Sequence, residues 1–131
     1  MKMNYSLLSR SLIALLFVVA GYQKLTGFAG TSGYVGSLVG VSSGMLAMIL
    51  TALVIVIEIP VALAYAWGYR VCITGGILVA FTIVTTVLAH RDFSVGMNMI
   101  MALKNIAIIG GILATTGLCS CNRCSAIEGK A

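Results

Sequence analysis

Four long apolar runs constrain this sequence more than any other feature. They cover about residues 6–22, 45–67, 71–89 and 97–118, and 60% of the chain is hydrophobic while only 8% is charged. A helix needs about 20 mostly apolar residues to cross the hydrocarbon core of a bilayer. Continuous rather than alternating hydrophobicity favours helices over the strands of a barrel. The sequence therefore predicts an all-α, polytopic membrane protein that folds as a four-transmembrane-helix bundle.

The ends of these runs carry aromatic and basic residues, as membrane interfaces do. Lysine and arginine are more frequent on the side of both termini than on the opposite side, which predicts cytoplasmic termini. The net charge of +5 is explained by this orientation, because no basic stripe for nucleic acid is present. A signal peptide cleaved near Ala20 is disfavoured, because Arg10 interrupts the first run and cleavage would leave three helices.

The chain is expected to hold one membrane domain over residues 1–118 and a short cysteine-rich tail over residues 119–131. Between the first two runs, Thr26 to Ser43 contains no charged residue and many glycines and serines. Tyr34, Leu38 and Val41 recur there at helical spacing, which indicates a short helix or a re-entrant segment. A flexible glycine-rich connector is the alternative.

Two charges inside the runs are expected to meet. Arg10 lies in the first run and Glu58 in the second, and antiparallel helices bring both toward the same membrane face. A guanidinium partner would keep a carboxylate ionised in hydrocarbon and donate two parallel hydrogen bonds. The sequence thus predicts a structural ion pair that fixes helix register. Pro60 removes one backbone hydrogen bond and is expected to bend the second helix beside Glu58.

A second group of polar residues comes from the opposite ends of three runs. Lys24, His90 and Lys104 lie there, and Asn105 follows directly. If the bundle closes, they form a basic cluster suited to an anion or to the carbonyl oxygens of a quinone headgroup. His90 is a candidate proton carrier, because imidazole titrates near pH ~6.5. The alternative is that Lys24 snorkels to the headgroups and His90 caps a helix.

The tail contains three cysteines in six residues, Cys119, Cys121 and Cys124, and Cys72 begins the third run. An even number of helices between them places all four thiols on one membrane face. They are candidate ligands for zinc or an iron–sulfur cluster, or a redox-active dithiol, and an unstructured tail is the alternative. No phosphate-binding loop, no H-E-x-x-H motif and no second histidine for haem is present.

Several short motifs, each in its expected run, together resemble the DoxX family over about residues 9–113. They are Arg10, Gly21-Tyr22-Gln23-Lys24, Glu58, Gly68 with Arg70, His90, Met101-Ala102-Leu103-Lys104-Asn105 and Gly110-Gly111. The resemblance implies a small bacterial or archaeal inner-membrane protein with a four-helix bundle. It also implies a link to thiosulfate oxidation with quinone, or to membrane-bound redox and thiol-stress assemblies. The cysteine tail is not part of the family pattern.

Two hypotheses about function follow. The first is an integral membrane subunit of a redox-linked system, with a quinone or small anion beside Lys24, His90, Lys104 and Asn105, and with His90, Lys104 and Glu58 as candidate catalytic residues. The second is a non-catalytic scaffold that recruits a redox enzyme through its cysteine tail. A small-solute carrier is the weakest alternative. The expected partners are the bilayer, a redox protein and, through the glycine pairs 75–76 and 110–111, further copies of the chain.

Overall fold

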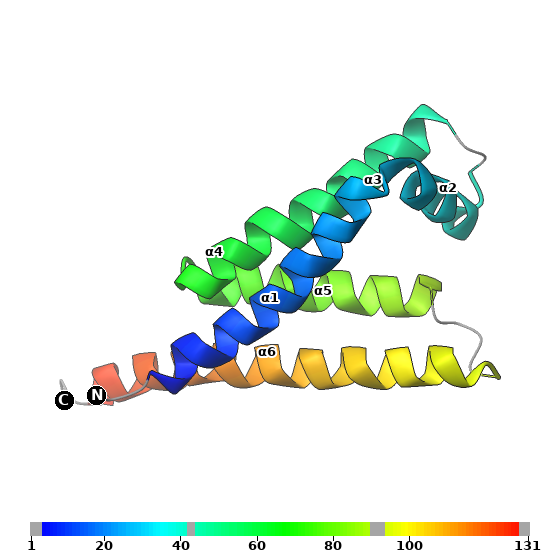
Figure 1. The fold of residues 1–131 in the computed structure, drawn as a ribbon. Helices are drawn as coiled ribbons and strands as arrows, with labels where there is room; N and C mark the ends of the chain where they lie inside the picture. The colour runs from blue at the N-terminus through cyan, green and yellow to red at the C-terminus, as the bar shows by residue number, and fades with distance from the viewer. Residues whose placement is uncertain (1–3, 42–43, 90–93, 129–131) are drawn as a thin grey trace.

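The computed structural model describes residues 4–41, 44–89 and 94–128, with backbone alone from Leu118 onward. Within these ranges the chain is helical apart from short connections, and no strand occurs (Figure 1). The elements are α1 (Tyr5–Thr26), α2 (Phe28–Val39), α3 (Met45–Val56), the π-helical turn η1 (Ile57–Val61), α4 (Ala62–Trp67), α5 (Val71–Ala89) and α6 (Gly96–Glu128).

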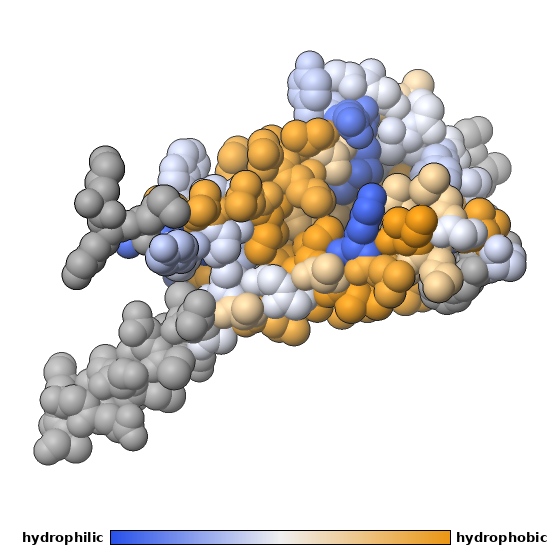
Figure 2. All heavy atoms as spheres, turned by 60° about the horizontal axis from the view of Figure 1, so that its bottom comes forward, coloured by the Kyte–Doolittle hydropathy of each residue, from blue (hydrophilic) through white to orange (hydrophobic). Residues whose placement is uncertain are grey.

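Four helical stretches are long and apolar enough to cross a membrane. They are Tyr5–Thr26, Met45–Trp67, Val71–Ala89 and Gly96–Gly117. The second is a single rod built from α3, η1 and α4. Large apolar side chains such as Leu12, Leu53 and Ile106 are more than half exposed, and orange surface covers much of the bundle in Figure 2. A surface of this kind is stable only against lipid tails, so the predicted all-α, four-span architecture is confirmed.

The two termini lie at the same end of the bundle, together with the loop that joins α4 to α5 (Figure 1). Four spans require this arrangement, because each span returns the chain to the opposite membrane face. The α2 helix lies at the other end, beside the beginning of α3.

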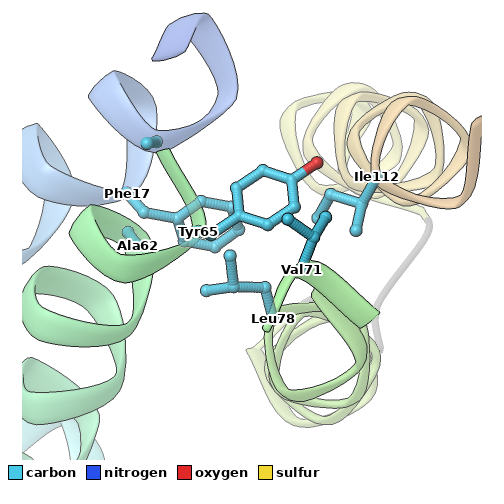
Figure 3. Packing of buried hydrophobic residues seen from close by; sticks show 7 residues of the cluster. Phe17, Ala62, Tyr65, Val71, Leu78 and Ile112 are labelled. Atoms are coloured by element: carbon cyan, nitrogen blue, oxygen red, sulfur yellow. The ribbon is translucent and has the colours of Figure 1, made fainter. Parts of the chain in front are cut away.

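The apolar core lies between α1, α4, α5 and α6, and Figure 3 shows its side chains. Tyr65 and Leu78 are fully buried at its centre, and Phe17 enters it from α1. The Tyr65 hydroxyl is hydrogen-bonded to the Thr115 hydroxyl, which ties α4 to α6. The core therefore fixes how the second and fourth spans pack, at the end of the bundle nearer the termini.

Glycine allows two close approaches between spans. A Cβ on Gly75 would lie 2.6 Å from Thr116 Cγ2 of α6, and a Cβ on Gly111 would lie 3.3 Å from Ile13 Cδ1 of α1. Gly76 and Gly110 have no such neighbour within 4 Å. One glycine of each predicted pair thus lies in an intramolecular helix contact, and the other faces outward.

The uncharged segment after α1 is a helix rather than a flexible connector. It begins after Gly27 and ends at Gly40, whose φ of 76° is the left-handed conformation common at helix ends. Gly36 lets α2 lie against α3, since a Cβ there would be 3.2 Å from Ala47 Cβ. Tyr34 and Leu38, which are at helical spacing in the sequence, both lie on this helix.

The second span is interrupted where Pro60 falls. Proline has no amide hydrogen to donate, so the regular α-helical ladder cannot continue through it. The chain adopts the wider π-helical turn η1 at this point, and the buried Glu58 lies inside that turn. Single π turns within α-helices are frequent at functional sites.

Candidate functional site

An ion pair within the membrane-spanning region is the central polar feature of the bundle. Lys24 Nζ, in the last turn of α1, lies 2.7 Å from Glu58 Oε1 and donates to Oε2 at 2.8 Å. The Glu58 side chain is 5% exposed and the Lys24 side chain 31% exposed. Both carboxylate oxygens therefore accept a charge-assisted hydrogen bond from one ammonium group.

Gly21 makes this pairing sterically possible. It lies one turn before Lys24 on α1, and a Cβ at this position would be 2.6 Å from Ile59 Cγ1 and 3.1 Å from Glu58 Cβ. Any other residue would push α1 away from η1. The close approach of the two backbones is what brings the Lys24 ammonium within reach of Glu58.

The predicted ion pair between Arg10 and Glu58 is wrong, because Glu58 pairs with Lys24. Arg10 lies beside Gly68 instead, where a Cβ would be 3.3 Å from Nη1 of the guanidinium. Gly68 follows Glu58 by ten positions, which is about 15 Å along a helix. The stagger between α1 and the second span therefore places Arg10 too far toward the termini to reach the carboxylate.

The ion pair lines a pocket of about 620 Å³. Five side chains of α2 form part of its wall, and α1, α3, η1 and α5 supply most of the rest. Figure 2 shows hydrophilic atoms in a furrow between hydrophobic side chains on one face. The lining residues are Ala20, Lys24, Thr31, Tyr34, Val35, Leu38, Val39, Leu50, Leu53, Val54, Ile57, Glu58, Phe81, Val84, Thr85, Leu88, Ala89 and Met101.

The predicted basic cluster is divided in the structure. Lys24 lines the pocket and is paired with Glu58. Lys104 is exposed on α6, one turn after Met101, which lines the pocket. Asn105 donates from Nδ2 to Thr86 Oγ1 of α5 at 2.8 Å. His90 lies outside the described residues, so its place in this group stays a prediction.

The four cysteines are only partly described. Cys72 is a free, exposed thiol at the beginning of α5. The backbone of the three tail cysteines continues α6, but their side chains fall outside the described part of the chain. Among the described residues, no three histidine, cysteine or acidic side chains lie together as metal ligands would. The zinc, iron–sulfur and dithiol hypotheses for the tail stay predictions.

The pocket contains polar residues that the sequence did not single out as site residues. Thr31 and Tyr34 come from α2, and Thr85 comes from α5. Thr85 Oγ1 donates to the backbone oxygens of Phe81 and Thr82. The helical spacing around Tyr34 was the one available signal, and it indicated a helix rather than a pocket wall.

Four membrane-crossing helices, with an apolar pocket and a partly buried ion pair between them, define a polytopic membrane protein. The DoxX family profile matches residues 5–91. The chain is 39% identical over 113 residues to the inner membrane protein YqjF of Escherichia coli K12, covering 85% of this chain and 82% of YqjF. It is 34% identical over 118 residues to the inner membrane protein YphA of the same organism, covering 85% and 81%.

This chain therefore belongs to the DoxX family and is an integral inner membrane protein. No solved structure matches it significantly.

Proposed function

We propose that this DoxX-family protein is a membrane subunit of a redox-linked system and binds a quinone in the pocket beside Lys24 and Glu58. One observation carries the proposal, namely an apolar pocket of about 620 Å³ with a buried ion pair in its wall. Pockets of about 300 to 1,000 Å³ with apolar walls and a few fixed polar groups are typical of small-molecule sites.

The wall chemistry fits a lipophilic ligand with a polar ring. Leucine, valine and phenylalanine side chains suit an isoprenoid tail. The Lys24 ammonium has three donor hydrogens, and its pair with Glu58 holds it in one position, from which it is a donor to a quinone carbonyl oxygen. Tyr34 and Thr31 add hydroxyl groups from α2. Lys104, which is exposed one turn beyond Met101 on α6, adds a further cation to this part of the bundle.

Reduction of a quinone to a quinol consumes two electrons and two protons. In this proposal a partner redox protein supplies the electrons, by oxidising a sulfur compound such as thiosulfate or a thiol. Glu58, Lys104 and His90 are the candidate groups for proton exchange with the two quinone oxygens. Both the partner redox protein and the sulfur compound that it oxidises are inferred from the family resemblance alone.

Quinone binding can be tested with a matched pair of space-filling variants. Val84 lines the pocket from α5, and its neighbour Ile83 does not, although the two side chains are 55% and 47% exposed. Val84→Trp is expected to weaken binding of decylubiquinone to the purified protein at least tenfold, while Ile83→Trp leaves it unchanged. Equal affinities for wild type and Val84→Trp would place the quinone elsewhere.

The polar groups can be tested separately from the pocket volume. Lys24→Met removes the donor, and a His90→Ala, Lys104→Ala double variant removes the other two cations. Both are expected to abolish the quinone reduction that accompanies oxidation of the sulfur compound in membranes. Thr51→Val is the control, because Thr51 is buried on α3, bonds only its own helix and does not line the pocket. Unchanged turnover in both variants would reject the proposed roles.

A scaffold that recruits a redox enzyme through its tail is the second candidate. The observation in its favour is that α6 is one continuous helix from Gly96 to Glu128, so the backbone of the cysteine tail continues the fourth apolar run without a break. The cysteines are thus on a helical extension at the end of the bundle that holds both termini. Deleting residues 119–131 is expected to release the partner from membranes, and an unchanged partner distribution would reject this role.

A further inference from the structure

Arg10 is the side chain whose environment the proposed quinone site does not explain. Its Nε atom is buried and has no hydrogen-bond partner. The only carboxylate within a membrane-crossing stretch, Glu58, is engaged by Lys24. A buried donor without a partner costs about 1–3 kcal/mol, and more when the group is charged. The described part of the chain therefore supplies no hydrogen-bond acceptor for Arg10 Nε.

The Arg10 side chain reaches the loop between α4 and α5. Its guanidinium lies against Gly68, in the loop between α4 and α5, with Nη1 and Nη2 at 3.3 and 3.4 Å from the position of a Cβ. Gly68 also has a φ of 85°. A side chain at this position is therefore disfavoured both by the contact with Arg10 and by the backbone conformation. The absence of a Cβ leaves room for the guanidinium at this corner of the bundle.

Arg70, two residues after Gly68, adds a second cation and directly precedes α5, and its guanidinium carbon lies 5.8 Å from the centroid of the Tyr69 ring. Its carbonyl accepts the first hydrogen bonds of that helix, from the amides of Ile73 and Thr74. Its φ of 43° is the left-handed region that residues with a side chain seldom adopt. This conformation occurs at the end of the loop, directly before Val71, the first residue of α5. The positive end of the α5 dipole therefore lies at the loop that contains Gly68 and Arg70.

We propose that Arg10, Arg70 and the first turn of α5 form a binding site for a phosphate group. Phosphate is the anion that matches a guanidinium with unsatisfied donors and a helix N-terminus. An acidic phospholipid headgroup is the source that the site's position favours, since Trp67 and Tyr69 are 83% and 64% exposed beside it, as interfacial aromatics are. Free phosphate from the aqueous phase is the other source of this chemistry.

Trp67 makes the site directly measurable. It is the only tryptophan of the chain and immediately precedes Gly68. Delipidated protein in a neutral detergent is titrated with phosphatidylglycerol, with phosphatidylcholine and with inorganic phosphate, and Trp67 fluorescence is followed. Saturable binding of phosphatidylglycerol is expected, at least tenfold tighter than that of phosphatidylcholine. Native mass spectrometry should show phosphatidylglycerol retained by the same sample.

Substitutions test whether the change in Trp67 fluorescence depends on the proposed residues. Arg10→Gln and Arg70→Gln are each expected to weaken phosphatidylglycerol binding at least fivefold, and Arg10→Lys to restore part of it. Lys104→Gln is the charge-matched control on another helix and should leave binding unchanged. Competition by millimolar inorganic phosphate would support the phosphate site and identify a soluble ligand. Equal responses to both lipids, without competition by phosphate or any effect of Arg10→Gln, would overturn the proposal.

Discussion

At the scale of single residues, the Lys24–Glu58 pair decides how charge is accommodated inside the bundle. Glu58 is almost fully buried, and Lys24 is the one cation among the described residues within hydrogen-bond distance of it. An ionised carboxylate without a partner is strongly disfavoured in such surroundings. The two residues therefore depend on each other, and each single substitution should affect stability more than their joint replacement.

Lys24→Met is expected to destabilise the fold by about 3 kcal/mol, because it leaves Glu58 buried without a partner. The double variant Lys24→Met, Glu58→Leu should recover most of that loss, since neither charge remains. Thermal unfolding in detergent measures both. A double variant as unstable as the sum of the two single variants would show that the residues act independently.

The partner of Glu58 could not be predicted from the sequence. Arg10 and Glu58 are recognisable as charges within apolar runs and were expected to pair with each other. Lys24, at the end of a run, was expected to join a basic cluster or to snorkel to the headgroups. The choice of partner depends on the stagger of α1 against the second span. That stagger is set by contacts far apart in the sequence, above all by the fit of Gly21 against Ile59. No local pattern contains this information.

At the scale of elements, small residues control how closely the helices pack. Gly75 and Gly76 are neighbours on α5 with opposite environments, since only a Cβ on Gly75 meets α6, 2.6 Å from Thr116 Cγ2. Gly75→Ala is expected to destabilise the bundle by about 1–3 kcal/mol through overpacking. Gly76→Ala should be neutral or slightly stabilising, because alanine favours helix. Thermal unfolding of the two variants compares them, and similar losses would contradict the packing.

The α2 helix offers a second matched pair. A Cβ on Gly36 would lie 2.8 Å from the Val41 carbonyl oxygen, whereas Gly33 has nothing within 4 Å. Gly36→Ala is expected to displace α2 from α3 and so disturb the pocket wall. Decylubiquinone affinity should fall several-fold for Gly36→Ala and stay unchanged for Gly33→Ala. Unchanged affinity in both variants would show that the position of α2 does not matter for the ligand.

The elements themselves were largely predictable, because a membrane span is a property of a continuous stretch. The four expected runs agree with the helices to within a few residues at their ends. The helical nature of the segment before α3 was left open by its glycines, which lower helix propensity. Tertiary contact with α3 through Gly36 and Ala47 decides that question in the folded protein. Pro60 predicted a bend beside Glu58, but the π-helical form of η1 depends on the packing around it.

At the scale of the whole molecule, four spans place both termini on one membrane face. The greater number of lysines and arginines on that face predicts that it is cytoplasmic. A carboxyl-terminal green fluorescent protein fusion is therefore expected to fluoresce, and a carboxyl-terminal alkaline phosphatase fusion to be inactive. The reverse pattern would invert the topology and place the phosphate site on the periplasmic face.

The continuation of α6 beyond the membrane has a consequence for the thiols of the tail. Span and extension form one uninterrupted helix to Glu128, so the angular direction of residues 119–124 is coupled to the rotation of the span in the bundle. Inserting one alanine after Gly117 would turn these positions by about 100° and advance them by about 1.5 Å. Inserting seven would restore their direction within about 20° and move them about 10 Å away. The packing of the α6 span against the other helices therefore sets the direction that residues 119–124 face.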